Sequence, residues 1–145
     1  MYRFRLQRVL EYRRRCEEEQ QQALRQAQLL HQNEATRLEA LQLAAQTQEE
    51  TLLATHGTGL SSAEWSAWQR HYALLAQDIA TQQEVVSQMT RQVLEHRQQV
   101  LVARQETRII EKLDEQAQQR YLAAQAQRDS QLLDELALTR SRHVR

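Results

Sequence analysis

The stretch THGTGLSSAEW, residues 55–65, contains both glycines of this chain of 145 residues. On either side of it the sequence is rich in Gln, Glu, Arg, Ala and Leu, and the chain has no proline. Because glycine and proline most strongly end helices, each flank is predicted to form one uninterrupted helix. We therefore expect an all-α protein, a long antiparallel two-helix coiled coil or helical hairpin. It would form a single domain over residues 1–145, with a helix at 4–54, a turn at 55–61 and a helix at 62–140.

The start of the second helix is marked by Ser61 and Glu64, which have the S-x-x-E spacing of a capping box. This predicts a helix start near Ser62. From there a three-four alternation of apolar residues predicts one face of a coiled coil, with only Gln82, His96 and Thr107 off the pattern. The residues of this face are Trp65, Trp68, Tyr72, Leu75, Ile79, Gln82, Val86, Met89, Val93, His96, Val100, Ala103, Thr107 and Ile110.

The first helix carries a weaker apolar face. Its apolar members are Leu6, Leu10, Leu24, Ala27, Leu38, Leu41, Ala45 and Leu52. Polar residues interrupt the same face at Arg13, Glu17, Gln20, His31, Glu34 and Gln48. We therefore expect a loosely packed seam between the two helices.

The second helix is predicted to extend beyond the first. If the chain reverses near Thr58, residues whose numbers add up to about 116 face each other, and about 40 Å of the second helix is left without an intramolecular partner. This overhang begins near Leu113 and still carries an apolar stripe through Tyr121, Leu132 and Leu136. We expect such a segment either to pack on another protein or to fray.

The composition gives little support for catalysis. The sequence has no glycine-rich phosphate loop, no pair of cysteines and no His cluster with metal-ligand spacing, and its 19 basic and 19 acidic residues cancel. No apolar run approaches the roughly 18 residues that a membrane span needs. We expect a cytoplasmic protein that is not an enzyme, binds no cofactor, metal or nucleic acid, and does not insert into a membrane.

Two local features each allow two interpretations. Trp68 and Tyr72 are large for a two-helix seam, so they either pack at the tip of the hairpin or form a partly exposed binding patch. The arginines at the amino end are either a solvated face or a docking surface for an acidic partner. They are Arg3, Arg5, Arg8, Arg13, Arg14 and Arg15.

Motifs at the two ends of the chain occur together. The opening motif is FRLQRVL, residues 4–10, followed by Tyr12 and Arg13; the closing elements are EKL at 111–113, Tyr121 and LDELA at 133–137. In these motifs, in length and in hairpin layout, the chain resembles the flagellar export protein FliJ family along essentially its whole length.

This resemblance implies a component of the bacterial flagellar type III export apparatus, with a role in flagellum biogenesis, protein transport, chemotaxis and motility. Proteins of this family form an antiparallel coiled coil similar to the central stalk of rotary ATP synthases. The end that holds both termini enters the ring of the export ATPase. They also contact the export gate protein and escort export chaperones, and are recruited to the cytoplasmic face of the inner membrane at the flagellar basal body.

The resemblance also implies functional residues. The expected ATPase-facing residues are Leu6, Leu10, Arg13, Leu113, Tyr121, Asp134, Glu135 and Ala137. The gate contact of relatives lies shortly after a tip tryptophan, which here is the neighbourhood of His71, Leu75, Asp78 and Gln82. Trp68 and Tyr72 are also large for a two-helix seam. We therefore predict a gate-facing site at Trp68, Tyr72 and Leu75.

Two other functions remain compatible with the sequence. One is the stalk component of a virulence-type injection system, which would share the same architecture. The other is a homo-oligomeric coiled-coil scaffold, in which the overhangs of two hairpins pair with each other.

Overall fold

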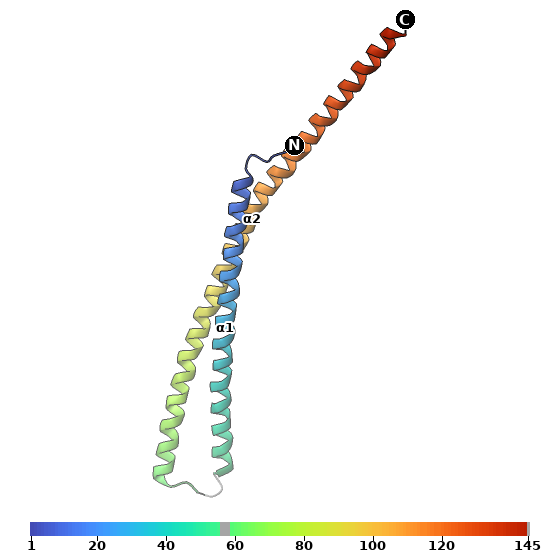
Figure 1. Cartoon of the computed structure of the whole chain (residues 1–145). Coiled ribbons are helices and arrows are strands. Elements are labelled where there is room, and N and C mark those ends of the chain that lie inside the picture. The colour runs from blue at the N-terminus through green and yellow to red at the C-terminus, as the bar shows by residue number, and fades with distance from the viewer. Residues whose placement is uncertain (56–58, 145) are drawn as a thin grey trace. The chain divides into compact units, whose positions relative to one another are not determined.

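The computed structural model describes residues 1–55 and 59–144, and this part of the chain contains two helices and no strand. Helix α1 spans Gln7–Thr55 with 49 residues, and α2 spans Ser62–His143 with 82 residues (Figure 1). The two long helices pack against each other, which confirms the predicted all-α helical hairpin. Gly57 and the expected point of reversal at Thr58 lie outside the described residues.

The beginnings of the two helices have different causes. Helix α1 begins at Gln7 rather than at the expected residue 4, because a turn comes first: the Gln7 N–H donates to the Phe4 carbonyl oxygen at 3.2 Å. Helix α2 begins at Ser62, as predicted. The Glu64 N–H donates to Ser61 Oγ at 3.2 Å, and the Ser61 N–H donates to Glu64 Oε2 at 3.3 Å. This is the reciprocal pair of a capping box.

The described chain divides into two compact units, each with a stretch of both helices. In the unit Gln20–Val100, α1 and α2 run antiparallel, as three side-chain contacts show. The Tyr72 hydroxyl donates to Glu49 at 3.0 Å, Gln82 donates to Glu34, and His31 Nε2 lies 3.0 Å from Thr90 Oγ1. Thr90 donates its own proton to the Val86 carbonyl oxygen, so its oxygen accepts from His31.

The second unit combines Met1–Glu19 with the part of α2 from Leu101 onward. Its helices are also antiparallel, and ion pairs flank its seam. Arg13 Nη1 lies 2.6 Å from Glu106 Oε2, and Arg104 Nε lies 3.6 Å from Glu17 Oε1. Because most of these groups are partly exposed to water, each pair contributes at most about 1 kcal/mol to stability. The pairs mainly favour the antiparallel alignment of opposite charges.

The predicted seam residues line both units. Every residue of the predicted α2 face except Trp65 is buried or half-buried, and so is every predicted seam residue of α1, polar ones included. Among the described residues the buried apolar set is small: Leu10, Ala27, Val93, Val100 and Ala103. Small side chains and interrupting polar groups therefore make the thin, loose seam that the sequence predicts.

The three polar residues of the α2 face differ in the hydrogen bonds that they form. Buried Gln82 hydrogen-bonds to Glu34, and the buried Thr107 hydroxyl donates to the Ala103 carbonyl oxygen at 2.9 Å. His96 is half-buried, but its Nδ1 atom is buried without a hydrogen-bond partner among the described residues.

The register and the overhang both depart from expectation. Glu34 and Gln82 fit the expected pairing, but Glu17 with Arg104 and His31 with Thr90 lie about one helical turn beyond it.

The partnerless segment also starts later than Leu113. Its expected first turns include half-buried residues at Asp114, Ala117 and Tyr121, because residues before α1 lie against α2. All described residues from 122 onward are exposed, so the free segment comprises residues 122–144 (Figure 1, orange to red).

Candidate protein-docking site

The first residues of the chain form an arm, Met1–Leu6, that lies against α2. The Tyr2 hydroxyl donates to Asp114 Oδ1 at 2.7 Å and lies 3.3 Å from the Asp114 carbonyl oxygen. The Tyr2 ring lies 5.5 Å from that of Tyr121, with 51° between the ring planes. Partial burial and the Asp114 carboxylate raise the pKa of Tyr2 to about 12. The arm therefore covers one face of α2 at Asp114 and Tyr121.

The free segment presents apolar side chains to water. Leu132, Leu133 and Leu136 are 57, 67 and 59% exposed. At 100° per residue these three lie within about 100° of arc on the helix, so they form one patch. Exposed apolar surface costs about 25 cal/mol per Å² relative to burial, so this patch favours contact with another surface.

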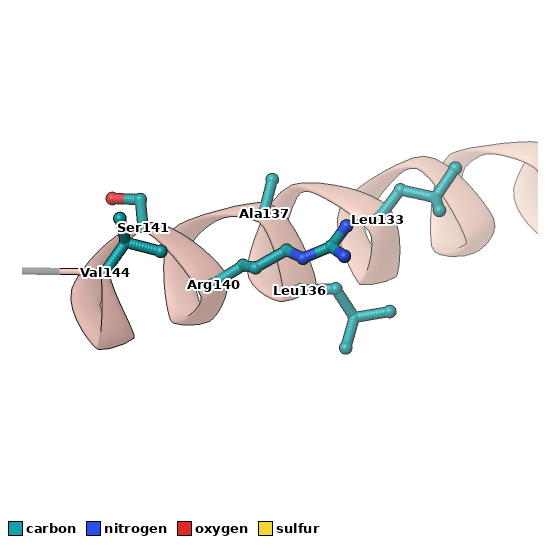
Figure 2. Close-up of a pocket in the computed structure, with 6 residues that line it drawn as sticks. All are labelled: Leu133, Leu136, Ala137, Arg140, Ser141 and Val144. Carbon is teal, nitrogen blue, oxygen red and sulfur yellow. The ribbon is translucent and has the colours of Figure 1, made fainter.

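The last turns of α2 combine this patch with basic groups. Figure 2 shows the Arg140 side chain running along the helix surface toward Leu133 and Leu136. Arg140, Arg142 and His143 lie in the last turn, where positive charge interacts favourably with the helix dipole. The remaining residues around this part of the surface are Ala137, Ser141 and Val144.

The expected ATPase-facing residues divide into those at the amino end, which lie in the seam, and those of α2, which are partly covered or fully exposed. Leu10 is 2% exposed, Leu6 is half-buried, and Arg13 is half-buried in its ion pair with Glu106, so all three belong to the seam of their unit. Leu113 is 42% exposed and Tyr121 packs on Tyr2. The other three are exposed in the free segment: Asp134, Glu135 and Ala137. The structure thus brings Tyr121 together with the arm and leaves the last three residues uncovered.

Three aromatic rings stack along the first turns of α2. The ring centroids of Trp65 and Trp68 are 5.6 Å apart at 19°, and those of Trp68 and Tyr72 are 5.2 Å apart at 13°. A hydrogen bond to the Glu49 carboxylate holds the Tyr72 hydroxyl and raises the pKa of Tyr72. Trp68, Tyr72 and Leu75 are half-buried, so each contributes to packing and also presents surface to solvent.

Two residues near this stack change the sequence-based view of it. Trp65 is exposed at 41% and is the most exposed of the three stacked rings, although the sequence pattern places it in the predicted face of the seam. The spacing of Trp65, Trp68 and Tyr72, three and then four residues, is the signal that predicts a row of rings on one helix face. Gln82 is 7% exposed and bonded to Glu34, so it is not available to a partner while the seam is closed.

Other kinds of site have no counterpart in the part of the chain that the structure describes. Across residues 1–55 and 59–144, no three His, Cys, Asp or Glu side chains gather in a way that could hold a metal ion. None of the described helices is long and apolar enough to cross a membrane. Arg13 and Arg14, from the basic amino end, form ion pairs with Glu106 and Glu111.

The fold is that of an all-α helical hairpin in which the last turns of α2 expose apolar side chains. The chain belongs to the flagellar FliJ family, because the family model described as "Flagellar FliJ protein" matches residues 2–145. This confirms the resemblance found in the terminal motifs. No curated protein and no solved structure matches the chain. Family membership makes the protein a component of the flagellar export apparatus, with a structural or escort role rather than an enzymatic one.

Proposed function

We propose that the protein is the central stalk of the export ATPase ring and links this ring to the export gate and to export chaperones. The observation that carries the proposal is the free segment of α2, in which every described residue is exposed and Leu132, Leu133 and Leu136 form one apolar patch on the helix. Each leucine buried in a partner can contribute about 1 to 3 kcal/mol to docking. The same leucines contribute almost nothing to the stability of the helix pair.

In this proposal the two groups of ATPase-facing residues have different roles. Leu6, Leu10 and Arg13 hold α1 against α2 and so support the end that carries both termini. The direct contacts to the ring come from exposed or partly covered residues of α2. These are Leu113, Tyr121, Asp134, Glu135 and Ala137, together with the three exposed leucines.

The proposed gate contact uses the aromatic row at the other end of α2. Trp68, Tyr72 and Leu75 are half-buried, and aromatic residues of this kind often dominate binding energy at interfaces. The Glu49 carboxylate supports the ring of Tyr72 through its hydroxyl. Binding to the gate recruits the protein from the cytoplasm to the cytoplasmic face of the inner membrane at the basal body.

Regulation of the ATPase follows from thermodynamic coupling. If one orientation of the stalk contacts one nucleotide state of the ring better than another, stalk binding shifts the ring toward that state. The size of the effect equals the difference in contact free energy between the two states. In this mechanism the stalk itself binds no nucleotide.

Truncation after Leu122 tests the proposal, because it removes the exposed leucines and keeps the contact between Tyr2 and Tyr121. We expect the truncated protein to melt close to the temperature of the full chain and to lose both binding to the export ATPase and stimulation of ATP hydrolysis. Truncation after Glu111 is a poorer test, since it also removes Asp114 and Tyr121, which hold the arm.

A substitution series refines this test. The triple variant Leu132→Ala, Leu133→Ala and Leu136→Ala keeps the helix propensity of the segment and removes its patch. The matched control replaces three exposed leucines of α1 by alanine: Leu29, Leu43 and Leu53. Full ATPase stimulation by the first triple variant overturns the proposal. A doubled molecular mass of the full chain that the same variant abolishes points instead to pairing of two free segments.

A further inference from the structure

The arm covers a residue that the proposed stalk uses. Tyr121 is one of the proposed ATPase-facing residues, yet its ring packs on Tyr2, and the adjacent Asp114 carboxylate already accepts the Tyr2 hydroxyl. A ring subunit that contacts Tyr121 from this side therefore meets the arm first. The two cannot occupy the same face of α2 at the same time.

The arm is held by few contacts. It precedes α1, and its Phe4 and Leu6 carbonyl oxygens accept backbone hydrogen bonds from the Gln7 and Leu10 N–H groups. Its attachment to α2 combines the Tyr2 hydrogen bond and ring contact with the half-buried side chains of Phe4 and Leu6. A hollow of about 380 Å³ lies between the arm and Asp114, lined by Tyr2, Arg3, Phe4 and Gln7. Because the hydrogen bond and the ring contact both come from Tyr2, and a hollow lies beside it, we expect the first residues of the arm to be released easily.

We propose that the arm is a strap that occupies the Asp114–Tyr121 face of α2 in the free protein and is displaced when the ATPase ring binds there. This inference rests on the proposed stalk function. The occupant in the free protein also indicates the chemistry of its replacement. The ring partner presents an apolar or aromatic side chain to Tyr121 and a hydrogen-bond donor to the Asp114 carboxylate.

Competition of this kind lowers the apparent affinity of the stalk for the ring, because only molecules with an open arm can dock fully. Weakening the attachment of the arm therefore strengthens binding. Tyr2→Phe removes the hydrogen bond to Asp114 and keeps the ring. Because Tyr2 is half-exposed and water can replace part of this bond, we expect an increase in affinity of about three- to tenfold.

The test uses the full chain and the purified export ATPase. Dissociation constants are measured for the native protein and for Tyr2→Phe and Tyr2→Ala, of which the second also removes the ring contact. The control is Tyr12→Phe, at an exposed tyrosine of α1. Limited trypsin cleavage after Arg3 and Arg5 reports arm opening in the same samples. We expect faster cleavage and tighter binding for both Tyr2 variants, with the larger effect for Tyr2→Ala, and neither change for the control.

The outcomes separate the two proposals. Equal or weaker ATPase binding by both Tyr2 variants, compared with the native chain, overturns the strap while the stalk function stands. Unchanged cleavage in both variants also overturns it, because the arm would then not depend on Tyr2. If neither the native chain nor any variant binds the ATPase, the stalk function fails and the strap fails with it.

Discussion

Gln82 of α2 donates hydrogen bonds to both the backbone carbonyl oxygen and the carboxylate of Glu34 in α1, at 3.0 and 2.5 Å. The pair lies within a seam that is otherwise mostly apolar, and Gln82 is 7% exposed. If the helices slid past each other by one turn, Gln82 would lose both acceptors and remain buried. A polar pair of this kind fixes the register of a helix pair, at some cost in stability.

We expect Gln82→Leu to lower the free energy of unfolding by about 1 to 3 kcal/mol, because it leaves the Glu34 carboxylate facing an apolar side chain without its partner. The double variant Glu34→Leu with Gln82→Leu is expected to recover most of this loss. Urea unfolding of both, and of Glu34→Leu alone, gives the coupling free energy. The control is Gln83→Leu, at an exposed neighbour. A coupling free energy near zero contradicts a role for the pair.

The capping box gives a second prediction. Ser61→Ala removes the side-chain oxygen that accepts the Glu64 N–H, so we expect a loss of about 1 kcal/mol and a melting temperature lower by about 2 to 4 °C. Ser62→Ala is the matched control, because Ser62 is the first helical residue and alanine favours helix there. Equal melting temperatures for Ser61→Ala and the native protein would show that the box does not stabilise α2.

The hydrogen bond between Tyr2 and Asp114 predicts that the stability of the protein depends on pH in the alkaline range. The folded protein raises the pKa of Tyr2 from 10.0 to about 12, so the fold favours the protonated hydroxyl. This contribution to stability is complete below pH 10 and is lost as the pH rises toward 12. The near-ultraviolet absorbance of the native protein minus that of Tyr2→Phe should follow ionisation of Tyr2 in this range, because the difference removes the signal of the other tyrosines. Asp114→Asn is expected to bring the midpoint back toward 10; an unchanged midpoint means that the carboxylate is not the cause.

The aromatic row predicts a separation between binding and stability. Replacing Trp68, Tyr72 and Leu75 together by alanine should weaken binding to the export gate, and motility, more than it lowers the melting temperature. Tyr72→Phe keeps the ring stack and loses only the hydrogen bond to Glu49, so we expect it to bind the gate nearly as well as the native protein. Normal gate binding by the folded fraction of the triple variant would assign these residues to seam packing alone.

Local sequence patterns predict much of this fold. The start of a helix and the face that it buries both depend on residues that are close to one another in the sequence. The S-x-x-E spacing correctly predicts the start of α2 at Ser62. The apolar alternation also predicts which side chains lie in the seam, including the polar ones at Gln82 and Thr107. The register between the two helices depends on the geometry of the turn that joins them. The periodicity of apolar residues carries no information about this geometry. For this reason the expected pairing is about one turn off at Glu17 and Arg104.

The candidate site is less predictable than the fold. The contact of Tyr2 with Asp114 joins residues 112 positions apart and lies outside any helical repeat, so no local pattern indicates it. Of the exposed leucines in the free segment, the predicted apolar stripe contains Leu132 and Leu136, whereas Leu133 lies beside that stripe and is predicted only as part of the LDELA motif. Which partner covers them depends on a second surface, and only the family resemblance suggests one.

The hydrogen-bonded cap at Ser61 and Glu64 also has a consequence for the order in which the protein folds. The farther a contact between the two helices lies from the cap, the longer the stretch of chain that it closes into a loop. The contact between Glu49 and Tyr72 spans 23 residues, and that between Glu34 and Gln82 spans 48. Loop closure becomes less favourable with length, and each contact that forms shortens the loop that the next must close. We therefore expect pairing to spread outward from the capped end, with the bond from Tyr2 to Asp114 forming last. A ribosome completes α1 before any of α2 exists, so the apolar face of α1 stays uncovered until synthesis has passed the cap.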